Sequence, residues 1–467
     1  MNNKRVGIVI TDGVGFRNYI LSDFLKEAEA TYKEVIIYSF LPKSAYKGFI
    51  TSAQVIELED IQDGFFTWFF MKLKEVAHMQ LNRKGNFGIQ FNYNRNKAKG
   101  STNRDHAKRF IYAFTQLFHS ERWISFFNKC QQRTFKNHKI TKQYFELLKS
   151  HNVDFLFFTH QRPPYIAPLV YAANKLGIKV CTFIFSWDNL ASKGRMAATF
   201  DYYFVWSELM KSELLDFYSK IKSRQIFVVG TPQFEPYVLE RYGLEESDFK
   251  TKFTLNKNEK TICYSCGDVT TSQNDGLYVE TIAEAIANGE IPKNTNFLVR
   301  TSPAETAERF IYLKDKYPFI IWNYPKWPLS REEHQETWSQ RIPAVEDMTD
   351  LKSILKYCDV FVNMCSTMSL DAMCFDRPVI NPVFGNKENG LYDDQRFLNY
   401  LHYKRVAESG AVAIVKNKEE LISGILEAID NPKLRLEAQK NLLKTQVSHK
   451  LEGTSKRIVN TINQCIS

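Results

Sequence analysis

The chain has 467 residues, of which 44% are hydrophobic and 24% are charged, a composition typical of globular proteins. This composition excludes wholesale disorder, and at about 150 residues per domain the length predicts two or three domains. Lysine and arginine exceed aspartate and glutamate by 62 to 52, which gives a net charge of +10. Such an excess favours anionic ligands such as nucleotides, phospholipid head groups or nucleic acid, and does not choose among them.

The eight cysteines follow no regular spacing, which indicates free, buried thiols in a reducing compartment. The N-terminus enters a strand-like run without a segment of signal-peptide type. No stretch of the sequence reaches the roughly 18 uncharged apolar residues of a membrane-spanning helix, and the nearest run, at 65–77, is interrupted by Lys72 and Lys74. We therefore expect a cytoplasmic protein, at most peripherally attached to the inner face of the cytoplasmic membrane.

The first domain is predicted to open with a strand at 5–11, the turn DGVG, a helix at 18–30 and a strand at 34–41. Strand, glycine turn, helix and strand form the pattern of a parallel α/β unit. Residues 53–150 interrupt this pattern with mostly helical sequence. Within them, the stretch 81–110 carries eight Lys or Arg and one Asp, which indicates an exposed basic insertion or loop. Further strands are predicted at 153–159, 178–185, 201–207 and 225–230.

A charged, turn-rich segment at 238–259 is typical of a domain junction. Strands predicted for the second domain lie at 261–266, 296–300, 319–322, 359–365 and 378–384. We therefore predict an α/β protein of two Rossmann-like, open parallel-sheet domains that face a cleft. They comprise residues 1–237, with the helical, basic insertion at about 53–150, and residues 238–450. Residues 451–467 are expected to form a C-terminal helix that packs back on the first domain.

The segment 359–385 has the richest set of polar residues beyond a predicted strand. The strand ends at Cys365, and Ser366, Thr367 and Ser369 follow at the start of a helix. The N–H groups and the dipole of a helix N-terminus attract anions, and hydroxyl groups add donors. Asp371, one turn further on, offers an acceptor for ribose or sugar hydroxyls. The alternative is that Ser366 or Thr367 only caps the helix.

This segment resembles the donor-binding segment of GT-B glycosyltransferases. It is especially similar to the branch that contains bacterial surface-carbohydrate transferases, of capsule and lipopolysaccharide type, and CDP-glycerol glycerophosphotransferases. In these proteins a strand leads into a Ser/Thr-rich turn, an acidic residue follows on the helix, and a strand that begins with proline comes next. The runs at 186–215, 228–237 and 402–432 are similar as well. The resemblance implies a GT-B fold, a nucleotide-sugar donor and a glycan or lipid-linked acceptor.

Two further strand ends of the second domain offer contacts to the donor. At one, Arg300 can meet a diphosphate with fork geometry, and Ser302 follows where related transferases often carry a His-Pro pair; a structural ion pair is the alternative for Arg300. At the other, Gly267 lets the backbone approach a ligand. The resemblance places this loop, with Asp268 and Thr270, against the donor phosphates, and a simple capped turn is the alternative.

Polar residues also follow three strands of the first domain. Asp12 is the acidic residue best placed as the general base that takes the proton of the acceptor hydroxyl, and capping of its own turn is the alternative. His160 and Asp188 follow the other two strands and are expected to orient the acceptor near that base, although each can also be an ordinary loop residue. The residues assigned to acceptor binding are Gly13, Arg17, Arg162, Trp187 and Asn189.

The expected activity is transfer of a sugar from a nucleotide-activated donor to a surface-glycan or lipid-linked acceptor, with inversion and without a metal or a cofactor. The lone CxxC at 263–266 lacks the further ligands that structural zinc needs. The alternatives are a nucleotide-sugar epimerase, a CDP-glycerol-type phosphotransferase of the same fold and, more remotely, a nucleic-acid-binding protein. Because no recognised nucleic-acid-binding module is present, we expect no nucleic-acid partner.

The aromatic run at 65–77 predicts one further partner. Five aromatic residues stand there beside Lys72 and Lys74, and a basic stretch follows at 83–109. Aromatic side chains next to cations suit an anionic lipid interface. We therefore expect peripheral contact with an anionic membrane, and the alternative is a buried helix beside a solvated loop.

Overall fold

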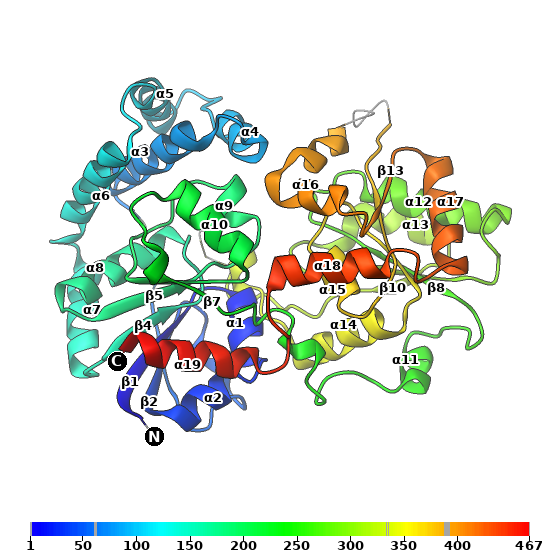
Figure 1. Cartoon of the computed structure of the whole chain (residues 1–467), viewed down its shortest axis with the longest axis horizontal. Coiled ribbons are helices and arrows are strands. Elements are labelled where there is room, and N and C mark those ends of the chain that lie inside the picture. Colours follow the sequence, from blue (N-terminus) through cyan, green and yellow to red (C-terminus); the bar gives the residue numbers. More distant parts are fainter. Residues whose placement is uncertain (1, 60–62, 333, 335, 387–392, 467) are drawn as a thin grey trace. The chain divides into compact units, whose positions relative to one another are not determined.

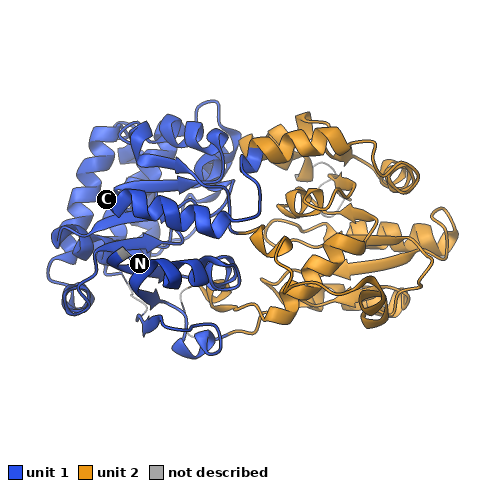
Figure 2. Ribbon diagram, turned by 60° about the horizontal axis from the view of Figure 1, so that its bottom comes forward, with its two compact units in different colours: residues 1–232, 330–335, 446–467 blue, residues 233–329, 336–445 orange. Residues whose placement is uncertain are grey.

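The computed structural model of the chain describes residues 2–59, 63–332, 334, 336–386 and 393–466 (Figure 1). It divides into two compact units, which Figure 2 colours separately. Unit 1 comprises residues 1–232, 330–335 and 446–467, and unit 2 comprises residues 233–329 and 336–445. The chain thus passes from unit 1 to unit 2 at 232/233, where the sequence predicts a junction at 237/238.

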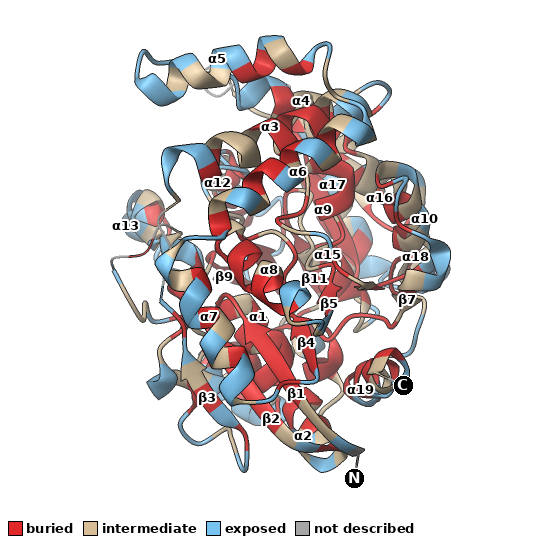
Figure 3. Cartoon of the chain, turned by 90° about the vertical axis from the view of Figure 1, so that its left-hand side faces the viewer, coloured by how far each residue is buried: buried red, intermediate tan, exposed pale blue. Residues whose placement is uncertain are grey.

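Unit 1 is built on a seven-stranded sheet with the order β3-β2-β1-β4-β5-β6-β7, and all neighbouring strands are parallel. Strand β4 is buried along its whole length and β5 from Val180 onward (Figure 3), as expected for a parallel sheet covered on both faces. The strands are β1 (Asn2–Ile10), β2 (Tyr32–Ser39), β3 (Gln54–Glu57), β4 (Phe155–Phe158), β5 (Lys179–Phe183), β6 (Tyr202–Val205) and β7 (Ile226–Val228).

The first α/β connection contains two helices, α1 (Gly13–Ile20) and α2 (Phe24–Thr31), in place of the single helix predicted at 18–30. Helix α1 begins earlier than predicted because Asp12 caps it: its carboxylate accepts from the backbone N–H of Gly15 at 2.8 Å. The C-terminal helix α19 (Thr454–Ile466) belongs to unit 1, where the Tyr32 hydroxyl donates to the carbonyl of Val459 at 3.0 Å. The later helices of this unit are α8 (Ala167–Lys175), α9 (Asn189–Ser192) and α10 (Glu208–Phe217).

Between β3 and β4 the chain forms a helical insertion, residues 65–150. It begins later than the predicted residue 53, because residues 54–57 pair with β2 as the edge strand β3. The stretch predicted as a basic insertion or loop at 81–110 forms α4 and most of α5 rather than an extended loop. Helices α3 to α6 share a core of their own, around residues such as Ile89 and Phe127. The helices are α3 (Phe65–Asn82), α4 (Phe87–Arg95), α5 (Asn103–Thr115), α6 (Glu121–Phe135) and α7 (Lys139–Ser150). None of the helices described in the chain is long and apolar enough to cross a membrane.

A buried lysine joins the insertion to the remainder of unit 1. The Lys74 ammonium donates to the side-chain oxygens of Asn128 and Gln131, at 3.1 and 2.9 Å, and to the carbonyl of Ala197 at 2.6 Å. The first two partners lie on or beside the facing helix α6, and the third lies in the loop before β6. These three hydrogen bonds offset part of the cost of burying the amine, although burial and the charge of Arg195 still lower the pKa of Lys74 to about 7. They attach the insertion to the loop that follows α9.

Unit 2 has a six-stranded sheet with the order β10-β9-β8-β11-β12-β13, again parallel at every pairing. The prediction of two open parallel sheets is therefore confirmed. The strands are β8 (Thr261–Ser265), β9 (Asn296–Arg300), β10 (Ile321–Asn323), β11 (Val360–Val362), β12 (Val379–Pro382) and β13 (Ala413–Val415). The helices are α11 (Glu246–Lys252), α12 (Asp275–Asn288), α13 (Ile311–Lys316), α14 (Val345–Tyr357), α15 (Met368–Met373), α16 (Leu401–Glu408) and α17 (Lys418–Asp430), and α18 (Leu436–Val447) leads back into unit 1.

Candidate active site

The three strand ends of unit 1 that carry predicted site residues are neighbours in the sheet. Strand β4 lies between β1 and β5, and the parallel direction brings their carboxyl ends to one edge. Asp12 follows β1, His160 follows β4, and Asp188 follows β5. The topology therefore gathers these three residues, from far apart in the sequence, where open α/β sheets bind ligands.

Asp12 and His160 form a buried, hydrogen-bonded pair. The Asp12 carboxylate lies 3.0 Å from Nδ1 of His160 and also accepts from the hydroxyl of Thr11 at 2.6 Å and from the N–H of Gly15 at 2.8 Å. Asp12 is 1% exposed and His160 is 5% exposed. Burial raises the pKa of the Asp12 carboxyl, but the hydrogen bond and charge of His160, with the other two donors, bring it below its ordinary value. Asp12 is therefore ionised at neutral pH.

His160 is a neutral imidazole with a defined tautomer. Burial lowers the pKa of His160 more strongly than Asp12 raises it, so the ring is uncharged at neutral pH. An ionised carboxylate only accepts hydrogen bonds, so the proton must lie on Nδ1 and the lone pair on Nε2. Nε2 is buried and has no hydrogen-bond partner among the described residues, and the ring stacks on Phe185 at 3.8 Å between centroids. This arrangement suits a general base held ready to accept a proton.

The loop after β5 is fixed to the loop after β4 by amide hydrogen bonds. Gln161 donates to the side-chain oxygen of Asn189 at 3.0 Å and accepts from the N–H of Phe185 at 3.1 Å. Asn189 in turn donates to Asp188 at 3.1 Å. The Asp188 carboxylate also lies 3.6 Å from the Lys193 ammonium, and its charge acts on His160. Asp188 is thus near His160 but already paired, which makes it a weaker candidate for the base.

The other predicted acceptor residues lie around this pair. Gly13 is the first residue of α1 and is buried, and Arg17 lies in the last turn of that helix, where its Nε donates to Asn18 at 3.1 Å. Arg162 is close enough for its charge to lower the pKa of His160. Trp187 is 5% exposed, so its ring contributes to the packing of this edge more than to an open surface.

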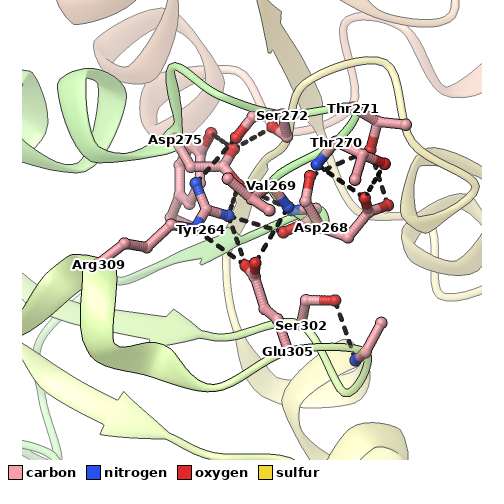
Figure 4. A network of polar contacts seen from close by, with 12 residues as sticks. Tyr264, Asp268, Val269, Thr270, Thr271, Ser272, Asp275, Ser302, Glu305 and Arg309 are labelled. Carbon is pink, nitrogen blue, oxygen red and sulfur yellow. Dashed lines mark hydrogen bonds and ion pairs between the residues drawn. The ribbon is translucent and has the colours of Figure 1, made fainter. Parts of the chain in front are cut away.

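In unit 2 the loop after β8 is held by its own side chains (Figure 4). The Asp268 carboxylate accepts from the N–H of Thr270 at 2.9 Å and from the hydroxyls of Thr270 and Thr271. The buried Asp275 carboxylate accepts from the N–H of Gly267 at 2.9 Å and from Arg309 at 3.0 Å. The side chains of Asp268 and Thr270 therefore form a capped turn, the alternative to donor binding that the sequence leaves open.

Arg300 forms a structural ion pair. It is 5% exposed, and its Nη2 lies 3.0 and 2.9 Å from the two carboxylate oxygens of Asp347, while Nη1 donates to Asn323. These contacts occupy the guanidinium N–H groups that were predicted to bind a diphosphate, so the structure favours the ion-pair alternative. The hydroxyl of Ser302 accepts from the N–H of Ala304 at 3.3 Å (Figure 4).

The Ser/Thr-rich turn before α15 divides into an inner and an outer part. Ser369 is fully buried and hydrogen-bonds Asn363 at 3.1 Å and Tyr403 at 3.0 Å, and Asp371 accepts from the hydroxyl of Tyr237. By contrast, Ser366 and Thr367 are half-exposed. The hydroxyl of Ser366 accepts from the N–H of Met368 at 3.1 Å, which leaves its proton available to another acceptor.

Sequence reasoning missed several polar residues that build these sites. Asn363 and Tyr403 complete the network of Ser369, and Asp347 neutralises Arg300, yet none follows a recognisable motif. Asn363, which directly follows the apolar strand β11, is the one signal that was available, because a buried amide needs partners. Among the described residues, no group of three or more His, Cys, Asp or Glu could hold a metal ion.

No protein-family model and no curated protein sequence matches the chain, but solved structures do. A UDP-GlcNAc 2-epimerase from Neisseria meningitidis bound to UDP-GlcNAc is similar at 11% identity with a TM-score of 0.54, over 98% of this chain and 100% of that one. MnaA of S. aureus in complex with UDP is 12% identical with a TM-score of 0.55, over 99% and 97% of the two chains. A glycosyltransferase from Rickettsia africae is 12% identical with a TM-score of 0.53, over the whole of both chains. These similarities confirm the GT-B fold.

Proposed function

We propose that the protein is a glycosyltransferase in which His160 deprotonates the acceptor hydroxyl. The observation that carries the proposal is the neutral imidazole of His160, held by ionised Asp12, with an unpartnered Nε2. The proposal changes the roles that the sequence suggested. Asp12 becomes the residue that orients His160 and stabilises its protonated form, because its own oxygens are already occupied by three donors.

The proposed reaction is a direct displacement at the anomeric carbon. The acceptor O–H proton passes to Nε2 of His160, the oxygen forms the new glycosidic bond, and the nucleotide phosphate leaves with the electron pair of the broken bond. This inverts the anomeric configuration. We propose that unit 2 holds the nucleotide, with the half-exposed hydroxyls of Ser366 and Thr367 as donors, and that activity persists in excess chelator.

A nucleotide-sugar 2-epimerase is the second candidate, because UDP-GlcNAc 2-epimerases are among the structures that share the fold at comparable TM-scores. A base such as His160 would serve that chemistry as well. The two functions separate in one experiment: the protein is incubated with a panel of nucleotide sugars, with and without glycan or lipid-linked acceptors, and products are followed by ³¹P and ¹H NMR. A transferase releases nucleotide when an acceptor is present, whereas an epimerase converts the nucleotide sugar without one.

Replacing Ser366 and Thr367 together by alanine is expected to weaken nucleotide binding. Each lost hydrogen bond to a charged phosphate costs about 1.5–3 kcal/mol, and calorimetric titration with UDP or another nucleotide that the panel identifies measures the loss. Ser423→Ala, at an exposed position of α17, is the control and should bind like the wild type. Unchanged affinity in a folded double variant would remove these residues from the donor site.

We also propose that the helical insertion docks on an anionic membrane. Residues 65–150 hold 17 Lys or Arg and four Asp or Glu, a net charge of +13, although the whole chain carries only +10. Apolar side chains are exposed in the same insertion: Phe66 of α3 is 67% exposed, Phe110 of α5 55%, and Leu117 in the turn after α5 80%. The centroid of the Phe110 ring lies 6.3 Å from that of Phe69 and 5.6 Å from that of Phe114. Exposed aromatic groups beside a strong positive charge suit an anionic lipid surface.

Co-sedimentation with vesicles tests this docking. We expect binding to vesicles that contain phosphatidylglycerol, little binding to phosphatidylcholine vesicles, and release at high salt because screening weakens the attraction. Replacing Phe66 and Leu117 by serine should weaken binding without a change in net charge, and Leu434→Ser, at an exposed position of unit 2, is the control. Absence of binding at low salt contradicts the docking, and preferential binding of nucleic acid would revive the alternative partner.

A further inference from the structure

A cationic cavity opens at the surface of the helical insertion, between α3, α4 and α5. Its volume is about 180 Å³. Its charged and polar walls come from Lys72 and Glu75 of α3, Arg95 at the end of α4, Lys97 in the following loop, and Lys108 and Tyr112 of α5. Each of the three helices therefore contributes at least one cationic side chain to the wall of the cavity.

The positive charges of this cavity exceed what the protein neutralises. Lys72 pairs with Glu75 at 2.6 Å. Burial raises the pKa of Glu75, but Lys72, with Arg162 and Lys74, brings it below its ordinary value, so this carboxylate is ionised. Arg95, Lys97 and Lys108 have no carboxylate within ion-pair distance among the described residues. Arg95 and Lys97 are exposed at the mouth of the cavity, where Lys97 lies 5.4 Å from the centroid of the Tyr93 ring. Like charges that share a cavity repel one another, and an anion between them would remove that cost.

We propose that this cavity binds a phosphate-bearing group. Three unneutralised cations favour a multiply charged anion over a single carboxylate, and the mixture of a planar guanidinium with two ammonium groups suits phosphate oxygens. The hydroxyl of Tyr112 already donates to the carbonyl of Tyr93 at 3.0 Å, which fixes that wall.

The position of the cavity connects it to the acceptor side of the candidate active site. A Cβ atom at Gly194 would lie 2.3 Å from Cγ of Glu75, so α3 and the segment after α9 approach as closely as glycine permits. Asn92 of α4 donates to the carbonyl of Ser192 at 2.7 Å. The cavity is thus attached to the loop that bears Asp188. If the proposed transferase function holds, the bound group is a phosphate of the acceptor; a phospholipid head group offers the same chemistry.

Calorimetric titration with inorganic pyrophosphate, in phosphate-free buffer at low salt, tests the site without relying on activity. Replacing Arg95 and Lys108 together by glutamine should weaken binding by about tenfold or more, since each removes a charged hydrogen-bond donor. The control replaces Arg122 and Lys129, two exposed cations of α6 outside the cavity, by glutamine. It loses the same charge and should bind like the wild type.

Three results would overturn the proposal: no binding by the wild type, equal weakening in both variants, or wild-type affinity in the cavity variant. The last would place pyrophosphate elsewhere, such as the donor site. Melting temperatures of both variants exclude unfolding as the cause.

Vesicle co-sedimentation then distinguishes the two sources of the phosphate, a lipid head group and the acceptor. A cavity variant that also loses phosphatidylglycerol vesicles indicates a lipid head group, whereas one that retains them indicates an acceptor phosphate; both results support the site, and the titration remains valid if the transferase function fails.

Discussion

His160→Ala is expected to reduce turnover by about 10²–10⁴-fold, the usual contribution of general-base catalysis. Nε2 of His160 has no hydrogen-bond partner among the described residues, whereas both carboxylate oxygens of Asp12 already accept hydrogen bonds. Removal of the imidazole therefore removes the proposed acceptor of the proton. Donor affinity should not change, because the hydroxyls proposed for the nucleotide lie in unit 2. Steady-state rates with an identified donor and acceptor, and titration with the nucleotide, measure the two quantities separately.

His106→Ala, at an exposed position of the insertion, serves as the control and should retain wild-type turnover. The wild-type pH profile provides a second check. Because burial holds the pKa of His160 below its ordinary value near 6.5, kcat/KM should be constant through neutral pH and fall only in more acidic solution, where the imidazole becomes protonated. Near-full turnover in a folded His160→Ala variant would transfer the role of base to another residue, and Asp188 would be examined next.

The fold could be predicted from the sequence because its elements are determined locally. Apolar runs such as 155–158, bounded by turn residues, indicate buried parallel strands, and both sheets contain the predicted strands. The edge strands β3 and β13 were not predicted. The insertion was harder to predict. Residues 81–110 are rich in charge, so they suggested an exposed insertion or loop. Ile89 and Tyr93 within them, and Ile111 directly after them, nevertheless belong to a core that also needs residues of α3 and α6. The apolar periodicity of such a helix is weak in its own sequence, because most of its packing partners lie elsewhere in the chain.

The positions of the candidate site residues could be predicted, but their hydrogen-bond partners could not. Asp12 and His160 follow two predicted strands, so their convergence required only the strand order. Which of them has an atom without a hydrogen-bond partner depends on burial and on the contact between Asp12 and His160, which joins residues 148 positions apart. The same holds for Arg300, which stands at the expected strand end but meets Asp347, a residue 47 positions later.

Asp12→Asn separates the two roles considered for Asp12. If it orients His160, the variant loses turnover by about 10²–10⁴-fold, because an amide neither stabilises the protonated imidazole nor enforces the tautomer with its lone pair on Nε2. The charge of Asp12 raises the pKa of His160, so its removal lowers that pKa further, and the residual activity should decline at a lower pH than in the wild type. If Asp12 is itself the base, the pH at which the residual activity declines should not be lowered in this way, and His160→Ala should lose less turnover than Asp12→Asn.

Stability provides the remaining control for this substitution. Asn is as good an N-cap as Asp, and its side-chain oxygen can still accept from the N–H of Gly15, so Asp12→Asn should leave the melting temperature nearly unchanged. Asp12→Ala loses the cap of α1 as well and should be less stable by about 0.5–2 kcal/mol. A loss of turnover shared by both variants, with a loss of stability only in Asp12→Ala, would assign the catalytic effect to the bond with His160. Equal destabilisation of both would mean that the carboxylate is needed mainly to hold the buried turn together.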